Sequence, residues 1–333
     1  MDALEFFTLI KSGELKGAYL MEGEEEFPKE KALSSLKETL FKDDNGMNVN
    51  VLMNPSSDEF CFAVDSPPWL SEKRLIIVKE SDLFEKNADE VKKYQRILDY
   101  LTKIPDFSIV IFYVRGKLNK TKAIFKAFDK LKRIVSFDKL KTNQLFSWIK
   151  KQFSICGLSC SDEFCEQLIF TAGNELLSLY NEIQKLVAFV NGRNLHLEDI
   201  DRVVTKSIEY RVFDLSDAIA KKDKDLAISL SQTMQKDGIA FPVMLAIIQK
   251  QLRQLLYVRL SVENGDSIQD ISKKLSLTQQ VVIKLKGLAN KFGFKNLIDG
   301  YLLSIDCEKE FKSGLVSEQG ALDRLIYRLI CEV

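Results

Sequence analysis

Apolar residues follow two different periods over the first part of the chain. Continuous apolar or β-branched runs are typical of strands covered on both faces, and strict alternation is typical of a strand with one solvated face. Runs of these kinds lie at residues 17–22, 47–53, 74–78, 108–114 and 133–137. Helical spacing lies between them at residues 29–41, 91–104 and 122–131. Because strands and helices alternate, we predict a parallel sheet with right-handed crossover connections.

Only helical spacing follows from about residue 141 onward. Short helices separated by glycines are expected first, at residues 143–153, 162–171, 176–190 and 197–206. Further helices are expected at residues 214–220, 225–235, 242–262, 268–275, 279–292, 297–312 and 320–331. The pattern therefore predicts an α/β domain over residues 1–140, a small helical domain over 141–210 and a larger helical domain over 211–333.

The charge balance argues against a general attraction to nucleic acid or membrane. The chain of 333 residues has 48 Lys and Arg against 48 Asp and Glu, so any such contact has to be local. Its longest apolar run, at 109–114, is far shorter than the roughly 20 residues of a membrane helix. Residues 1–13 include Asp2 and Glu5 and do not have the long apolar run of a signal peptide. We therefore expect a cytoplasmic protein.

One segment begins like a phosphate-binding loop and then departs from it. Gly23 follows the first expected strand, and Lys29 stands where a GxxxxGK[ST] loop has its lysine. Pro28 replaces the second glycine and removes a backbone donor, and Glu30 replaces the hydroxyl that binds Mg²⁺. The three glutamates at 24–26 add charge that repels phosphate. We therefore predict a nucleotide-binding fold with a degenerate phosphate loop and no cofactor.

Other catalytic arrangements find little support in the sequence. His196 is the one histidine, no GxSxG motif accompanies it, and it lies at an expected helix start, which indicates a structural role. Asp199 and Asp201 are spaced to point to different faces of a helix, so they do not form a two-metal pair. An ATPase needs an acidic pair at the end of a strand beside the loop, but the strand at 74–78 leads to only one glutamate, Glu80. We expect no catalytic residues.

The cysteines do not have the spacing of a metal site. There is no CxxC pair among the 6 cysteines, and zinc ligand spacings are absent, so no metal is expected. Cys156, Cys160 and Cys165 have apolar neighbours such as Phe164 and Leu168. We interpret these three cysteines as small thiols of a helical core.

Two segments could bind nucleic acid. Residues 268–288 have the length and pattern of a helix-turn-helix, but the second helix is dominated by apolar residues, which favours packing over reading bases. A DNA-binding regulator built on this segment is the alternative function. A basic stretch follows the strand at 108–114 and includes Lys117, Lys120, Lys122 and Lys126. A solvated helix face is the simplest interpretation of the stretch, and contact with DNA or a partner is the alternative.

A rigid loop carries two adjacent large apolar residues. Pro67 and Pro68 stiffen the backbone directly before Trp69 and Leu70, and a polar run that begins at Ser71 leads into the next strand. The pair could fill the core where the loop meets the sheet, or it could be an exposed anchor for a partner, because Trp is enriched at binding hot spots. The residues alone do not favour either interpretation.

Several segments together carry a resemblance to a known family. They read Tyr-Leu-Met-Glu-Gly-Glu-Glu-Glu-Phe at 19–27, Pro-Trp-Leu-Ser-Glu-Lys-Arg-Leu at 68–75, Val-Phe-Asp-Leu-Ser-Asp-Ala-Ile at 212–219, Gln-Leu-Arg-Gln-Leu-Leu at 251–256 and Leu-Asp-Arg-Leu-Ile at 322–326. None of them is specific alone, but their order and spacing are. Over essentially its whole length the chain resembles the delta subunit of the bacterial DNA polymerase III clamp loader.

The resemblance implies an architecture and a set of partners. It implies an AAA+-like first domain without nucleotide, a helical lid domain and a C-terminal helical collar domain. In the family the collar assembles with the ATPase subunits (gamma/tau) and delta prime into a pentamer, and DNA is contacted only within that assembly. Delta binds the ring-shaped sliding clamp (beta) and favours its opening. The nucleotidyltransferase activity of the polymerase III holoenzyme belongs to another subunit.

The resemblance also assigns a role to the rigid loop. In the family the clamp contact is a pair of large hydrophobic residues just before the Ser-Glu-Lys-Arg stretch, and here those positions are Trp69 and Leu70. The pair departs from the Leu-Phe or Phe-Phe pairs of the family, although the same pocket should accept it. We therefore expect Trp69 and Leu70 to bind the clamp, with Pro68 and Ser71 as flanking residues.

Overall fold

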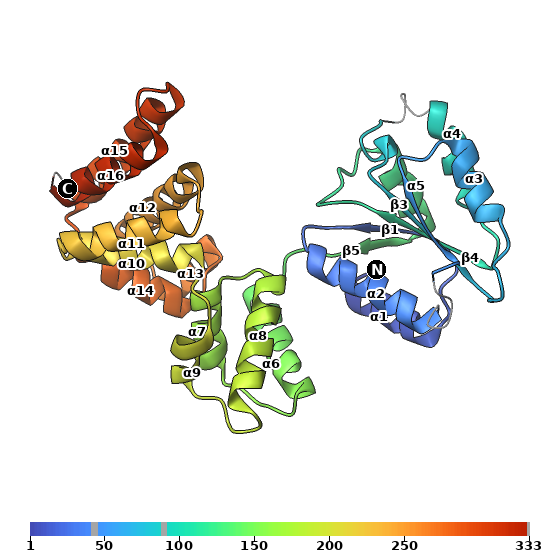
Figure 1. Ribbon diagram of the computed structural model, residues 1–333, viewed down its shortest axis with the longest axis horizontal. Helices are drawn as coiled ribbons and strands as arrows, with labels where there is room; N and C mark the ends of the chain where they lie inside the picture. Colours follow the sequence, from blue (N-terminus) through green and yellow to red (C-terminus); the bar gives the residue numbers. More distant parts are fainter. Residues whose placement is uncertain (41–45, 88–91, 332–333) are drawn as a thin grey trace. The chain divides into compact units, whose positions relative to one another are not determined.

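The structure of the chain, a computed structural model, describes residues 1–40, 46–87 and 92–331 and falls into two compact units (Figure 1). The first unit spans Met1–Lys139 and the second spans Leu140–Val333. The first contains a parallel sheet with helices on both faces, and the second is helical over its described residues. The predicted combination of an α/β part and an all-α part is therefore confirmed.

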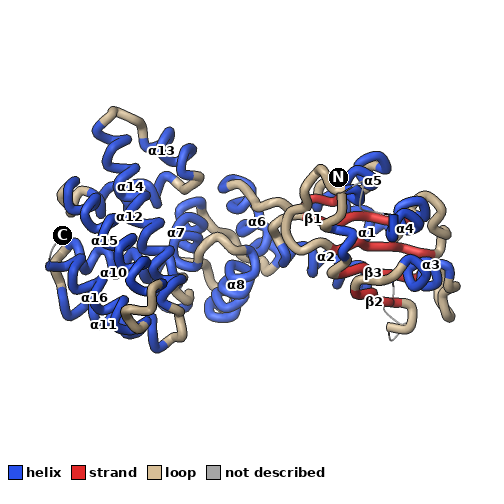
Figure 2. Tube along the Cα trace, turned by 90° about the horizontal axis from the view of Figure 1, so that it is seen from above, coloured by secondary structure: helices blue, strands red, loops and turns tan. Residues whose placement is uncertain are grey.

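The first unit alternates strands and helices along the chain. Its elements are α1 Ala3–Ser12, β1 Gly17–Glu22, α2 Glu26–Leu40, β2 Val49–Met53, α3 Ser57–Asp65, β3 Arg74–Lys79, η1 Asp82–Phe84, η3 Lys92–Tyr94, α4 Gln95–Tyr100, β4 Ser108–Tyr113, α5 Ala123–Leu131 and β5 Ile134–Ser136. The strands form a five-stranded parallel sheet in the order β2-β3-β4-β1-β5. Figure 2 shows β2 at one edge of this sheet, next to β3.

Two apolar layers cover the two faces of the sheet. Helices α1 and α2 bury residues such as Phe6 and Leu36 against one face, and α3, α4 and α5 bury residues such as Phe60 and Phe128 against the other (Figure 1). Burial on both faces explains why the central strands read as continuous apolar runs. The parallel register aligns Met21 of β1 with Tyr113 of β4, so the carboxyl ends of the strands lie at one edge of the sheet.

All five expected strands are present, and they shift by at most two residues at either end. The helix expected at 29–41 begins earlier, at Glu26, and residue 41 lies outside the described residues. The helix expected at 91–104 is a 3₁₀ turn followed by the short α4, and residue 91 also lies outside the described residues. The sequence analysis did not predict α1 and α3.

Each expected helix of the second unit is present, but the helix expected at 214–220 begins at Ile208, and other ends differ by up to three residues. The helices are α6 Thr142–Ile155, α7 Asp162–Ala172, α8 Leu176–Val190, α9 Leu197–Val203, α10 Ile208–Ala220, α11 Lys224–Lys236, α12 Phe241–Glu263, α13 Ile268–Leu275, α14 Gln279–Ala289, α15 Phe294–Lys312 and α16 Glu318–Cys331. The long helix α12 packs against α10, α14, α15 and α16 and is the centre of one apolar core.

The predicted domain boundary at 210–211 falls inside helix α10, and the helices on either side of it contact each other within the second unit. Helix α7 contacts α10, and the Ser207 amide donates to the Thr171 carbonyl at 2.8 Å. The unit is compact as a whole, and the predicted domain boundary at 210–211 inside it stays a prediction. Among residues 1–40, 46–87 and 92–331, no helix combines the length and apolarity needed to cross a membrane.

Candidate functional site

The loop after β1 turns its backbone donors toward the protein itself. Gly23 has a φ of 120°, and a Cβ at this position would lie 2.3 Å from the Phe137 carbonyl oxygen, so only glycine fits. The Gly23 amide donates to the Gly116 carbonyl at 2.9 Å, and the Glu25 amide donates to Phe137 at 2.9 Å. A phosphate cradle needs such amides to converge on the ligand. Here they secure the loop to neighbouring segments.

Lys29 is fully buried, and protein acceptors take its hydrogen bonds. Its ammonium donates to the carbonyl oxygens of Gly23 at 2.9 Å and Val114 at 2.8 Å, and to Oε1 of Glu26 at 2.5 Å. An ammonium has three donors, so these acceptors use all of them. Pro28 lies in the first turn of α2, where a missing amide hydrogen removes no helix bond.

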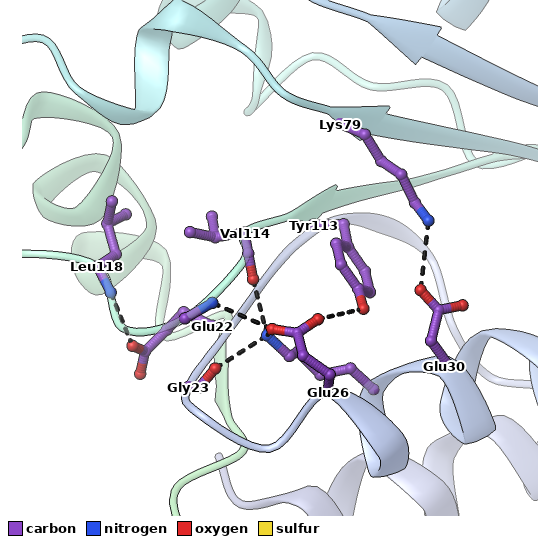
Figure 3. Close-up of polar contacts among 10 residues, drawn as sticks. Glu22, Gly23, Glu26, Glu30, Lys79, Tyr113, Val114 and Leu118 are labelled. Atoms are coloured by element: carbon purple, nitrogen blue, oxygen red, sulfur yellow. Dashed lines mark hydrogen bonds and ion pairs between the residues drawn. The ribbon is translucent and has the colours of Figure 1, made fainter. Parts of the chain in front are cut away.

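Glu26 connects the lysine to the ends of two other segments. Its carboxylate accepts from the Tyr113 hydroxyl at 2.7 Å and from the Gly116 amide at 3.1 Å, as Figure 3 shows for Tyr113. Partial burial of Glu26 opposes its ionisation, but the hydrogen bonds from Lys29 and Tyr113 outweigh that effect and lower the pKa of Glu26. Burial, and then the bond to Glu26, raises the pKa of Tyr113. The network therefore holds a carboxylate, an ammonium and a neutral phenol.

The residue at the metal-binding position of a phosphate loop forms an ion pair with the end of β3. Glu30 stands where a phosphate loop has its metal-binding hydroxyl, and Lys79 ends β3. The Lys79 ammonium lies 3.3 Å from Oε1 of Glu30 and 4.4 Å from the centre of the Tyr113 ring (Figure 3). Gly23, Lys29 and Glu30 therefore lie in one network of protein groups, and the degenerate phosphate loop stays a prediction.

Trp69 and Leu70 are both exposed on the loop between α3 and β3. Their exposed fractions are 67% and 95%, so the core-filling interpretation of this pair is wrong. Leu70 has a φ of 51°, a left-handed conformation that is unfavourable for a residue with a Cβ. Pro68 is half-buried, and the Ser71 hydroxyl accepts a hydrogen bond from the Lys73 amide at 3.5 Å. The loop thus presents two large apolar side chains to solvent.

A residue that the sequence analysis did not single out holds this loop. Asn48 is 1% exposed, and its side-chain amide donates to the Trp69 carbonyl at 2.7 Å and accepts from the Trp69 amide at 2.6 Å. Its sequence neighbour Met47 is exposed. The separation of 21 residues between Asn48 and Trp69 left no local signal of this contact.

The basic stretch divides into bound and free side chains. Lys117 forms an ion pair with Asp138 at 2.9 Å, and the Lys122 ammonium donates to the Glu85 carbonyl at 2.5 Å. Lys120 and Lys126 are exposed, and their side chains have no hydrogen bond or ion pair with any residue in the described ranges.

The helix-turn-helix-like segment forms two helices, α13 and α14, joined through Ser276. Helix α14 packs against α12 through Val282 and Leu285, both of which are buried. Its Lys284 is held against α7, with its ammonium 2.8 Å from Oε1 of Gln167 and 3.6 Å from the centre of the Phe170 ring. The exposed positions of α14 are Gln279, Gln280, Ile283 and Gly287, which carry no charge.

The remaining candidates have structural roles. His196 begins α9, and Asp199 in its first turn is buried and bound by the Arg193 guanidinium at 2.6 and 2.8 Å. Cys165 is buried as expected, but Cys160 is only partly buried and Cys156 is exposed, so the core interpretation is wrong for Cys156. The described residues contain no cluster of three or more His, Cys, Asp or Glu that could hold a metal ion.

Comparison with known proteins connects this geometry to a family. The family described as DNA polymerase III, delta subunit matches residues 19–138, and the DNA polymerase III delta subunit, C-terminal domain matches residues 209–329. DNA polymerase III subunit delta of Bacillus subtilis (strain 168) is 22% identical over 276 residues, which cover 80% of each chain. A probable DNA polymerase III subunit delta of Aquifex aeolicus (strain VF5) is 24% identical over 287 residues, which cover 82% of this chain and 78% of the relative.

A solved structure agrees with these relatives. The Bacillus subtilis DNA clamp loader delta protein (YqeN) superposes with a TM-score of 0.62 at 20% identity, covering 98% of this chain and 99% of that chain. The similarity extends through the sheet and the helices that follow it. It confirms the predicted fold class, an α/β part with a parallel sheet followed by helices.

Proposed function

Because this chain belongs to the family of DNA polymerase III delta subunits, we propose that it binds the sliding clamp (beta) and favours opening of the clamp ring during DNA replication. The observation that carries the proposal is the pair Trp69 and Leu70, two large apolar side chains exposed side by side on a loop with a fixed backbone. Exposed Trp and Leu on a rigid loop suit insertion into an apolar pocket of a partner.

Trp69 and Leu70 act as the anchor, with Pro68 and Ser71 as flanking contacts. Burying each of the two side chains contributes roughly 1.5–3 kcal/mol. Hot-spot residues of this kind cost about 2 kcal/mol or more when they are truncated. Their fixed backbone reduces the ordering cost on binding. The anchor therefore provides enough free energy for a specific contact without a large interface.

The chain opens the ring by differential binding and not by bond chemistry. A subunit that binds the open ring more tightly than the closed ring shifts the equilibrium between these two ring states by the difference in affinity. The closed network of Lys29, Glu26 and Glu30 supports a subunit that binds no nucleotide. ATP is used by the neighbouring ATPase subunits (gamma/tau), and polymerisation belongs to another subunit of the cytoplasmic holoenzyme.

The three parts of the chain have separate tasks in this proposal. Residues 1–140 carry the clamp-binding loop, residues 141–210 form a lid, and residues 211–333 form the collar that joins gamma/tau and delta prime in a pentamer. The buried core around α12 gives the collar its own apolar support. Lys120 and Lys126 are free to contact DNA within the assembly, where partners supply further positive charge.

The test is binding of the purified chain to its sliding clamp, with the wild type beside a Trp69→Ala/Leu70→Ala double variant. We expect tight binding that the double variant loses while keeping its fold and its assembly with the ATPase subunits. Leu4→Ala is the matched control, because Leu4 is also a large exposed side chain but lies on α1, which follows the bridge from Asp2 to Ser136 of β5, the edge strand opposite β2. A double variant that binds like the wild type would overturn the proposal.

A wild type that does not bind alone needs one further measurement. If the ATPase subunits capture it and the resulting assembly binds the clamp, the loop requires the assembly to become accessible. If the chain neither joins the ATPase subunits nor binds the clamp in their presence, it is not a clamp-binding subunit.

A further inference from the structure

The sheet itself fixes the position of Asn48. The residue directly precedes β2, and its carbonyl accepts from the Leu75 amide at 2.8 Å, which continues the pairing of β2 with β3 by one step. Its side chain is 1% exposed and crosses to the loop that precedes β3. The side chain therefore starts from a rigid element and reaches a loop whose own residues are largely exposed.

The amide of Asn48 acts as a peptide group would in a sheet. It gives a hydrogen bond to the Trp69 carbonyl and takes one from the Trp69 amide, at 2.7 and 2.6 Å. Two bonds to one residue define the orientation of its backbone as well as its position. The side chain of Trp69, in contrast, remains two-thirds exposed, so the loop is held by its main chain alone at this point.

A second contact secures the start of the loop. The Arg74 guanidinium, at the first position of β3, donates to Oδ1 of Asn50 at 2.9 Å and to the Pro67 carbonyl at 3.4 Å. Between Pro67 and Arg74 lies Leu70 with its left-handed φ of 51°. A conformation of this kind costs about 1 kcal/mol or more and persists only where surrounding contacts determine it.

We propose that Asn48 is a positioning residue that holds the Trp69–Leu70 loop in its presented conformation before a partner arrives. This inference rests on the proposed clamp-binding function and adds the device that prepares the site. Without the amide of Asn48, the loop would sample other conformations and Leu70 would relax from the left-handed region. Binding would then have to order the loop again, which lowers the affinity although neither anchor side chain has changed.

The mobility of Trp69 can be measured directly. The chain has 2 tryptophans, so a Trp148→Phe background leaves Trp69 as the one tryptophan emitter. In the full-length chain with this background, we expect Asn48→Ala to speed the decay of Trp69 fluorescence anisotropy. Asn48→Asp keeps the acceptor for the Trp69 amide but places a carboxylate oxygen against the Trp69 carbonyl oxygen in place of the donor, so it should also speed the decay.

Clamp affinity is measured on the same variants. We expect Asn48→Ala to weaken clamp binding about 10-fold, the loss that corresponds to ordering one or two loop residues on binding. Asn54→Ala is the matched control, because it removes an amide at the other end of β2 whose acceptor binds Asp82 and not the loop. Circular dichroism and thermal unfolding establish whether each variant is folded. If Asn48→Ala is not folded, Asn48→Asp replaces it in both measurements.

The outcomes separate this inference from the proposed function. If the anisotropy decay of Trp69 is unchanged in folded Asn48→Ala, the positioning role is overturned and the clamp assignment stands. The same conclusion follows if Trp69 becomes mobile in this variant but the clamp affinity is unchanged. A wild type that does not bind the clamp either alone or together with the ATPase subunits, combined with release of Trp69 in Asn48→Ala, would overturn the clamp assignment and still support the hold of Asn48 on the loop. Faster anisotropy with weaker binding, and no change in Asn54→Ala, supports both.

Discussion

Lys29 is the residue at which this chain departs most clearly from nucleotide binding. In a phosphate loop the lysine neutralises ligand oxygens. Here the oxygens come from Gly23, Val114 and Glu26, so the buried charge is compensated inside the protein. A buried ammonium without such partners would carry a large desolvation penalty. The contacts of Lys29 therefore give it a role in the stability of the first unit.

Replacing Lys29 should destabilise the first unit. Lys29→Met keeps the length of the side chain but leaves two buried carbonyls and the Glu26 carboxylate without their donor. We expect a loss of about 2–4 kcal/mol in the free energy of unfolding, measured by urea denaturation. The control is Lys37→Met on the exposed side of the same helix, which should change stability by less than about 0.5 kcal/mol. Equal effects of the two substitutions would contradict this role.

Asp199 should make the stability of the second unit depend on acid pH. The hydrogen bonds from Arg193 lower the pKa of Asp199 to about 2, while an aspartate in the unfolded chain has a pKa of about 3.9. A lowered folded-state pKa contributes stability above the unfolded pKa, and that contribution disappears as pH falls through the folded pKa. We expect Asp199→Asn to be less stable than the wild type by about 2 kcal/mol at neutral pH.

The sign of this dependence can be checked by urea denaturation at a series of pH values. The difference between wild type and Asp199→Asn should be constant from about pH 7 to pH 5 and should narrow below about pH 4. Asp201→Asn is the matched control, because Asp201 is exposed on the same helix. A difference that grew as the pH fell would rule out the assigned ion pair.

At the scale of single elements, the periodicity of apolar residues predicted the five strands and most of the helices but missed α1 and α3. The strands were found because burial on both faces gives continuous apolar runs. Helices α1 and α3 were missed although both begin with a capping box, Asp2 with Glu5 and Ser56 with Glu59. Their length is not the reason, because the shorter α13 was predicted, and the capping boxes were the local signal that could have found them.

The sequence predicted only part of the candidate site. The spacing of Gly23 and Lys29 was visible because a loop motif is local in sequence. The ion pair between Lys29 and Glu26 was not visible in the sequence, because the expected helix began at Lys29 and so left Glu26 outside its first turn. The contact of Asn48 with Trp69 depends on the pairing of β2 with β3, which no local pattern encodes.

Helix α14 should not read DNA. Its apolar side is packed on α12, its Lys284 is occupied by Gln167 and Phe170, and its exposed positions are uncharged. We expect the isolated chain to show no sequence-selective binding to duplex DNA, even at low salt, in fluorescence anisotropy titrations against a mixed-sequence pool. A selected sequence whose affinity falls in a Gln279→Ala/Gln280→Ala variant would instead support the DNA-binding regulator.

At the scale of the whole molecule, the chain divides between a sheet unit and a helical unit, each with its own apolar core. Trp69 and Leu70 lie in the first, while the second contains the segment that matches the C-terminal domain of the family. If the two tasks follow this division, clamp binding and assembly should be separable by cutting between the units.

This division of tasks can be tested with two fragments of the chain, one for each unit. A fragment of residues 140–333 retains the whole core around α12 and all helices from α6 onward, so it should fold with the helical circular dichroism of the second unit. We expect it to join the ATPase subunits in a pull-down and to leave the sliding clamp unbound. The complementary fragment, residues 1–139, should bind the clamp with an affinity that still depends on Trp69. If the helical fragment were to bind the clamp as tightly as the full chain, the contact would lie outside the loop, and both the anchor and the positioning role of Asn48 would have to be abandoned.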